Sequence, residues 1–203
     1  LDKHQMTITY FGYGSLVNID TIPAGVEVTP GTLHGWVREW KVCGESPDGQ
    51  GRCALTVREK EGSRIMGVMA REPKTRLAEL ELREKRYLKV EAVGGAFRCD
   101  ASMRPGPDEL FLFRAAPEHC RWGTDKHPIL QSYLDCVLAG FYRFWGEAGI
   151  DHFLETTDGW HVPVLPDRAN PLYPRKIVLD PEVATLIDSK LKDLGVNFLS
   201  PAT

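Results

Sequence analysis

The sequence predicts an α+β fold: a mixed or antiparallel sheet, curled into a compact β-barrel, with flanking helices. Two observations predict it. In the first half of the chain, apolar runs rich in β-branched and aromatic residues follow one another with turns between them. In the second half, apolar residues recur at three- and four-residue spacing, which is typical of helices. Because strands in direct succession favour antiparallel or mixed pairing, a doubly wound fold is disfavoured.

Four strands are expected first, over residues 8–13, 26–36, 53–58 and 65–70, with a turn over 44–51 between the second and third. The first helix is expected over residues 73–86, where strong helix formers dominate, with Thr75 as its N-cap. Two more strands are expected over 87–97 and 109–113, joined by a polar loop that contains two prolines.

The rest of the chain is predicted to be mainly helical. One helix covers residues 128–145, with Pro128 in its first turn and Gly146 at its end. Another runs from Asp180, the N-cap, to Gly195. Residues 156–176 contain four prolines, so we expect an ordered loop packed over the domain, and a role facing the substrate stays open for it.

Composition points to a small soluble ligand. The 203 residues are 42% hydrophobic and 26% charged, with a net charge of −3, so neither a nucleic-acid nor a membrane surface is expected. No apolar run reaches the roughly 20 residues of a spanning helix, and the N-terminus lacks the order of a signal peptide, which predicts a cytoplasmic protein. We expect one domain over residues 6–203, starting at Met6, with a core over about 7–115 and C-terminal helices and loop over 120–200. The protein is expected to be a monomer or a homodimer.

The five cysteines are odd in number, widely spaced and without a CxxC pair, which predicts reduced thiols rather than a disulfide framework or a zinc site.

A glycine turn ends the first predicted strand. The residues Tyr13, Gly14, Ser15 and Leu16 do not complete a dinucleotide-binding fingerprint, because Val17 stands where a third glycine is needed. They are not a nucleophile elbow either, because Tyr13 and Val17 flank Ser15 where glycines belong. Two interpretations remain: a concave group of main-chain amides that binds a carboxylate, or a tight turn with no ligand.

Glu84 stands out on the first predicted helix. At 100° per residue it lies near the middle of an apolar stripe with Leu77, Leu80 and Leu88, whereas Glu79 points to solvent. A carboxylate that faces the core has a tendency toward a raised pKa, which suits proton transfer near neutral pH. The alternatives are a helix that ends one turn earlier, or an ion pair of Glu84 with Arg83 or Arg86.

Together these segments resemble the gamma-glutamylcyclotransferase-like family. The resemblance lies in FGYGSL at residues 11–16, GRCALTV at 51–57, GVMA at 67–70 and LELREKRY at 80–87, and it covers roughly residues 7–115. It implies a compact mixed α/β barrel and an enzyme of the acyltransferase or lyase type. Such an enzyme converts a gamma-glutamyl amide or peptide into 5-oxoproline and a free amine, as in glutathione metabolism, without a metal or organic cofactor.

The resemblance also implies roles for particular residues. Glu84 would be the acid/base residue, and the loop Tyr13, Gly14, Ser15 and Leu16 would hold the α-carboxylate of the gamma-glutamyl group. Tyr87 and Arg52 would contact the substrate.

Two other functions stay open. One is a non-catalytic protein on the same fold that binds a gamma-glutamyl group or a similar small carboxylate. The other is an acyl hydrolase that uses Cys53 or Ser15, for which the scattered histidines offer no placed base.

Overall fold

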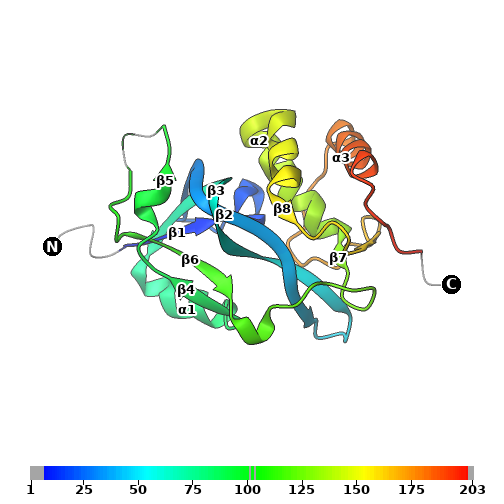
Figure 1. Cartoon of the computed structure of the whole chain (residues 1–203), viewed down its shortest axis with the longest axis horizontal. Helices are drawn as coiled ribbons and strands as arrows, with labels where there is room; N and C mark the ends of the chain where they lie inside the picture. The colour runs from blue at the N-terminus through cyan, green and yellow to red at the C-terminus, as the bar shows by residue number, and fades with distance from the viewer. Residues whose placement is uncertain (1–6, 101, 103, 201–203) are drawn as a thin grey trace.

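The structure is a computed structural model that describes residues 7–100, 102 and 104–200. Its centre is a curled, mixed sheet with the strand order β4-β6-β1-β3-β2-β5 (Figure 1). Strand β1 (Thr7–Gly12) pairs antiparallel with β3 (Gly51–Pro73) and parallel with β6 (Leu110–Ala115). Strand β2 (Glu27–Glu45) pairs antiparallel with β3 along most of its length. The predicted fold class, a curled mixed sheet with flanking helices, is confirmed.

The outer strands are short. Strand β4 (Tyr87–Val90) pairs antiparallel with β6, and β5 (Phe97–Arg98) pairs antiparallel with β2. Strand β7 (Ile129–Leu130) joins β3 and β9 (Val164–Leu165), and β8 (Thr157–Asp158) joins β2. The predicted strand over 87–97 is therefore too long, because the chain leaves the sheet after Val90 and Ala92 adopts a positive φ of 61°.

The long strands β2 and β3 bend where their register changes. The pairing passes from His34 with Arg64 to Trp36 with Glu59, so Gly35 on β2 lies opposite the four residues 60–63 of β3. Gly35 has a φ of 87°, which a residue with a side chain adopts only at a cost. The two strands expected over 53–58 and 65–70 are thus the two ends of one bent strand.

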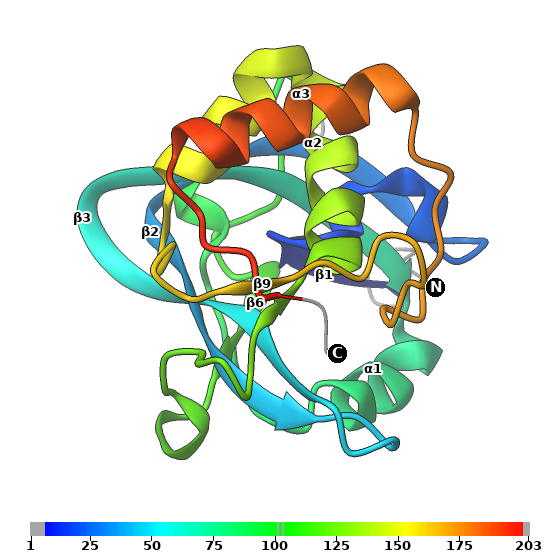
Figure 2. The same cartoon turned by 90° about the vertical axis from the view of Figure 1, so that its right-hand side faces the viewer.

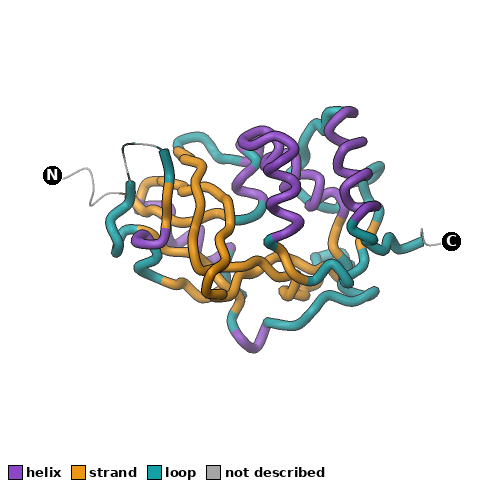
Figure 3. The backbone as a smooth tube through the Cα atoms, turned by 45° about the horizontal axis from the view of Figure 1, so that its top comes forward, coloured by secondary structure: helices purple, strands orange, loops and turns teal. Residues whose placement is uncertain are grey.

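Three α-helices lie within the described residues: α1 (Leu77–Arg83), α2 (Gln131–Glu155) and α3 (Pro181–Asp193). Helices α2 and α3 lie together over one side of the sheet, as Figures 2 and 3 show. Lys190 of α3 contacts Glu147 and Asp151 of α2, with N–O distances of 2.7 Å in both pairs. Helix α1 lies on the other side of the sheet, beside β4 (Figure 1).

Helix boundaries differ from the expected ones at both ends of α1 and at both ends of α2. The first helix begins at Leu77, with a 3-10 turn before it, so Thr75 is not its N-cap, and it ends at Arg83. Helix α2 begins after β7, which removes Pro128 from the helix. Gly146, with a φ of 64°, interrupts α2 as expected, but a second helical segment then continues to Glu155. The N-cap Asp180 is confirmed: its side chain accepts hydrogen bonds from the amides of residues 182 and 183.

Three clusters of buried apolar residues hold the sheet in place, and the smallest of them joins the sheet to α1 through Leu80. The largest lies between the sheet and α2 and α3, and includes Trp40, Leu55, Phe141, Phe153 and Ile187, all at most 2% exposed. A second cluster is formed by side chains of β2, β3 and β6, with Leu33, Ile65, Met69, Leu110 and Leu112. The predicted loop over 156–176 is ordered, because it carries β8 and β9 and buries Val162 and Val164 in the largest cluster.

Within the described residues, no helix is long and apolar enough to cross a membrane. The predicted start at Met6 and positions 101 and 103 of the predicted polar loop lie outside the described residues.

Candidate functional site

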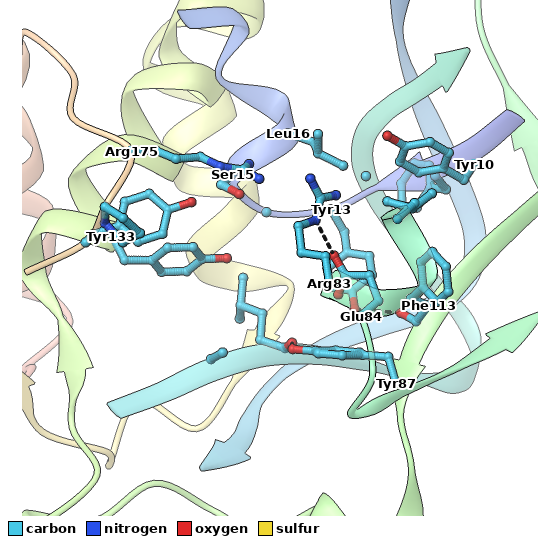
Figure 4. A pocket seen from close by; sticks show the side chains of 18 residues that line it. Tyr10, Tyr13, Ser15, Leu16, Arg83, Glu84, Tyr87, Phe113, Tyr133 and Arg175 are labelled. Atoms are coloured by element: carbon cyan, nitrogen blue, oxygen red, sulfur yellow. Dashed lines mark hydrogen bonds and ion pairs between the residues drawn. The ribbon is translucent and has the colours of Figure 1, made fainter. Parts of the chain in front are cut away.

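A cavity of about 310 Å³ opens where β1 ends, and it brings together residues from distant parts of the chain. Its walls come from the glycine turn, from the end of α1, from β3 and β6, and from α2 and the loop after it (Figure 4). The volume lies at the low end of the range for ligand pockets in proteins, roughly 300–1,000 Å³. Of the predicted site residues, Tyr13, Gly14, Ser15, Leu16, Glu84 and Tyr87 all line this cavity.

The glycine turn forms one wall. Residues Ser15–Val17 make a single 3-10 turn directly after Gly14, and the first amides of such a turn lack acceptors within it. Neither Gly12 nor Gly14 has a positive φ, so neither glycine is required here by a left-handed backbone. Gly14 is needed for space instead: a Cβ there would lie 2.6 Å from the hydroxyl oxygen of Tyr133.

Helix α2 packs directly on this turn. The side-chain amide of Asn18 donates to the carbonyl of Cys136, with an N–O distance of 2.9 Å. Gly140 lets the helix approach the backbone of Asn18, since a Cβ at position 140 would lie 2.6 Å from the Asn18 nitrogen. The turn is therefore held against a rigid element rather than left as a free loop.

Arg38 anchors the turn from inside the protein. Its side chain is fully buried, and its Nε donates to the carbonyl of Tyr13 at 2.8 Å. Its two other nitrogens donate to the hydroxyl of Thr156 and to the carbonyl of Met66, and the rings of Phe141 and Phe153 lie over its guanidinium. Burial lowers the pKa of Arg38 to about 9, so the group stays charged at neutral pH. No carboxylate pairs with it within the described residues, so its charge adds positive potential behind the turn.

Glu84 forms the opposite wall, but not as predicted. It is the C-cap residue of α1 rather than part of its apolar stripe, since the helix ends at Arg83. Leu88, expected on the same stripe, lies on β4 and is 51% exposed. The Glu84 side chain is 25% exposed, and its Oε1 accepts a hydrogen bond from Nε of Arg83 at 3.2 Å. The two alternatives raised from the sequence, an earlier end of the helix and an ion pair with Arg83, are thus both present. Glu84 nevertheless lines the cavity.

Three buried tyrosines shape the cavity. Burial is the main cause that raises the pKa of Tyr13, Tyr87 and Tyr133, so all three keep their protons at neutral pH. The hydroxyl of Tyr13 donates to the carbonyl of Phe113 at 2.6 Å, and that of Tyr87 donates to the carbonyl of Leu55 at 2.9 Å. Because main-chain carbonyls already accept these two protons, Tyr13 and Tyr87 hold the walls of the cavity in place.

The C-terminal part of the chain completes the cavity. Tyr133 from α2, and Tyr173 and Arg175 from the following loop, line it. Figure 4 shows Tyr133 and Arg175 on the side of the cavity that holds Ser15. The rings of Tyr133 and Tyr173 meet edge to face, with centroids 5.0 Å apart. Tyr133 was visible in the sequence only as one of the apolar residues of a helix. Its place against Gly14 depends on how α2 packs on the sheet, which periodicity does not predict.

An ion-pair cluster holds this loop. Arg168 donates to both carboxylate oxygens of Asp135 on α2, at 2.7 and 2.8 Å, and to both oxygens of Asp188 on α3, at 2.9 and 2.8 Å. Asp135 is buried, which raises its pKa, while the hydrogen bonds from Arg168 oppose that rise. The same loop places Tyr173 and Arg175, so the cluster fixes part of the cavity wall.

Two residues that were assigned to a site from the sequence, Arg52 and Cys53, do not line the cavity. Arg52 lies on β3 and does not line the cavity that holds Glu84. Cys53 is 3% exposed and its pKa is raised by burial, which removes the thiolate that an acyl hydrolase needs. Ser15 does line the cavity, but none of the histidines among the described residues does. The arrangement therefore offers one carboxylate, two guanidiniums, tyrosine hydroxyls and main-chain amides.

The fold has counterparts among solved structures. A gamma-glutamyl cyclotransferase is 13% identical to the chain, with 90% of this chain and 99% of that one covered and a TM-score of 0.54. An uncharacterized human protein is 14% identical, with 90% and 99% covered and a TM-score of 0.49. A yeast gamma-glutamyl cyclotransferase specific to glutathione is 12% identical, with 93% and 96% covered and a TM-score of 0.44.

Of these three, the first carries the comparison of folds, since its TM-score is above 0.5. It shows that the chain has the gamma-glutamylcyclotransferase-like fold expected from the sequence. No protein-family model and no curated protein matches the chain by sequence.

Proposed function

We propose that the chain is a gamma-glutamylcyclotransferase-type enzyme with Glu84 as its general acid and base. The observation that supports this most is that the Glu84 carboxylate and the glycine turn face one small cavity, on the fold of a gamma-glutamyl cyclotransferase. A site that cyclises a gamma-glutamyl group needs a carboxylate holder and a proton carrier within reach of one substrate, and this cavity offers both.

The reaction needs no co-reactant. The α-ammonium of the substrate first gives a proton to Glu84, and the free nitrogen then attacks the γ-carbonyl carbon of the same molecule. A carbon–nitrogen bond forms and closes the five-membered ring of 5-oxoproline. The original γ-amide carbon–nitrogen bond breaks as Glu84 returns its proton to the departing amine. The ring nitrogen loses a second proton, which the freed amine takes up as it leaves as an ammonium ion.

Positioning supplies most of the catalysis in this proposal. The amides of the turn Gly14–Leu16 would hold the α-carboxylate, so that the flexible chain folds back on itself. Well-oriented intramolecular attack lowers barriers by up to about 7–11 kcal/mol. The turn amides and the Tyr133 hydroxyl are the donors that would stabilise the negative charge developing on the γ-oxygen, since Tyr13 and Tyr87 already donate elsewhere.

One observation favours a second function, a non-catalytic protein that binds a small carboxylate. Arg83 already donates a hydrogen bond to one oxygen of Glu84, so this carboxylate has a partner within the cavity wall. In that case the same cavity would bind the gamma-glutamyl group without turnover.

The test is to incubate the purified protein with gamma-glutamyl dipeptides, glutathione and a gamma-glutamylamine, and to follow 5-oxoproline and the free amine by mass spectrometry. The enzyme proposal expects both products in equal amounts from at least one compound. A thermal shift with these compounds in the absence of any product would support the binding protein instead.

A further inference from the structure

Two cysteines face each other across the long strands β2 and β3. Cys43 of β2 is the register partner of Cys53 of β3. The Cys53 amide donates to the carbonyl of Pro128 at 2.8 Å, on the β7 side of the strand and away from β2. Cys43 and Cys53 are therefore a non-hydrogen-bonded pair, the kind in which the Cα atoms of opposite residues lie about 4.5 Å apart and the side chains come closest.

Both cysteine side chains lie against one segment, residues 121–123. The Cys43 thiol contacts the carbonyl oxygens of Arg121 and Trp122, with S–O distances of 3.5 and 3.4 Å. A Cβ at Gly123 would lie 2.9 Å from the Cβ of Cys53. Cys53 belongs to the largest core cluster, and Cys43 packs against it. The two sulfur atoms thus lie on the same face of the sheet.

The two thiols differ in access to solvent. Cys53 is 3% exposed, whereas Cys43 is half-buried. The pKa of Cys53 is raised, first by burial and then by the neighbouring Cys43. A small oxidant in solution therefore reaches Cys43 first, and Cys53 lies beside it as the second sulfur.

The strands need not move to join the two sulfur atoms. Disulfides usually connect Cα atoms that lie roughly 4.4–6.8 Å apart, and the spacing of a non-hydrogen-bonded pair falls within this range. Both cysteines are free thiols in this structure, which is the reduced form of the pair.

We propose that Cys43 and Cys53 form a redox modification site, at which a hydroperoxide joins the two thiols into a disulfide between β2 and β3. The Cys43 sulfur attacks one oxygen of hydrogen peroxide, the oxygen–oxygen bond breaks, and the other oxygen leaves as water with the thiol proton. The Cys53 sulfur then attacks the sulfur of the Cys43 sulfenic acid. The sulfur–oxygen bond breaks, and the hydroxyl group leaves as a second water with the Cys53 proton.

This site is separate from the candidate active site. Neither cysteine lines the cavity that holds Glu84, although Ala54 and Leu55, the next residues of β3, do. The inference goes beyond the proposed function, and its test does not depend on turnover of any gamma-glutamyl compound.

The experiment maps the thiols of the native protein after treatment with hydrogen peroxide. Remaining thiols are alkylated, and the chain is digested with trypsin, which cleaves after Arg52 and so separates Cys43 (residues 42–52) from Cys53 (residues 53–58). The two peptides should appear joined, two hydrogens lighter than their sum, and should separate on reduction. The thiol count of the denatured chain should fall by two from its starting value of five.

Three variants assign the order of the steps. Cys53→Ala should stop the reaction at the sulfenic acid, which dimedone labels on the peptide 42–52. Cys43→Ala should leave the peptide 53–58 unmodified, because the buried Cys53 is not reached by itself. Cys120→Ser, which removes an exposed cysteine outside the pair, is the matched control and should form the same disulfide as the wild type.

Three results would overturn the inference, and all three come from the wild-type chain, so they do not depend on how well the variants fold. One is that both peptides stay unlinked after peroxide treatment. Another is that Cys43 is linked mainly to the peptide 115–121, which contains Cys120. The third is an equal yield of the expected disulfide in urea-denatured protein, which would mean that closeness in the sequence, and not the pairing of β2 with β3, joins the two thiols.

Discussion

Replacing Gly14 by alanine should disturb the site through one identified atom. The new Cβ would lie 2.6 Å from the hydroxyl oxygen of Tyr133, whereas ordinary contacts begin at 3.4 Å. Tyr133 cannot easily retreat, because its ring packs edge to face against both Trp40 and Tyr173. Overpacking of this kind costs about 1–3 kcal/mol of the free energy of unfolding.

Removing that atom should relieve the strain. In Tyr133→Phe, the nearest atoms to a Cβ at position 14 would be Leu55 Cδ1 at 3.5 Å and the Cζ of residue 133 at 3.8 Å, both ordinary contacts. The cost of Gly14→Ala is therefore expected to fall by about 1–2 kcal/mol in the Tyr133→Phe background.

The assay is urea unfolding of the wild type, both single variants and the double variant, compared as a double-mutant cycle. A coupling energy near zero would refute the packing of Tyr133 on Gly14. So would a Gly14→Ala variant as stable as the wild type.

Two other predictions concern stability. The pKa of His152 is lowered from 6.5 to about 4, first by burial and then by Arg38 and Arg64, and its Nε2 accepts the Met66 amide at 2.9 Å. The imidazole of His152 takes up a proton near pH 6.5 in the unfolded chain, but only near pH 4 in the folded one. The neutral imidazole therefore stabilises the fold fully above pH 6.5. As the pH falls toward 4, the free energy of unfolding drops by about 1–2 kcal/mol, after allowance for the partial exposure of the side chain. In urea unfolding at pH 7 and 4.5, the free energy of unfolding of His152→Gln should change less between the two pH values than that of the wild type. An equal change in both proteins would contradict this prediction. Arg168→Gln leaves the buried Asp135 without its partner and should cost about 2–4 kcal/mol by urea unfolding. A cost below 0.5 kcal/mol would show that the cluster does not hold the loop.

The sequence predicts the fold class because its signals are local. Successive β-type runs with turns between them are enough to expect an antiparallel or mixed sheet, and Asp180 followed by proline is enough to place the start of α3. The end of α1 is less predictable, because residues up to Arg86 favour helix, yet the helix ends at Arg83 and the chain pairs with β6 from Tyr87 onward. Tertiary contacts therefore override local propensity there.

Only some of the residues that line the cavity can be predicted from the sequence. The glycine turn and Glu84 stand out because glycines after a strand and an acid among leucines break the local pattern. Tyr133 does not break its pattern, and Arg175 lies 91 residues beyond Glu84 in a loop whose path depends on the Arg168 cluster. Such residues are found only when the fold brings distant segments together.

The most direct test of the proposed function separates turnover from binding at Glu84. Glu84→Gln is nearly isosteric and keeps an oxygen that can accept from Arg83, but it cannot carry the proton. Glu81→Gln, at an exposed position of the same helix, is the matched control.

With a gamma-glutamyl compound that the wild type converts, we expect Glu84→Gln to lose at least about 100-fold in kcat, as for loss of a general acid or base, while its Kd by calorimetry stays within about threefold. Glu81→Gln should behave as the wild type. If Glu84→Gln still forms 5-oxoproline at the wild-type rate, Glu84 is not the acid/base residue and the proposed mechanism is wrong.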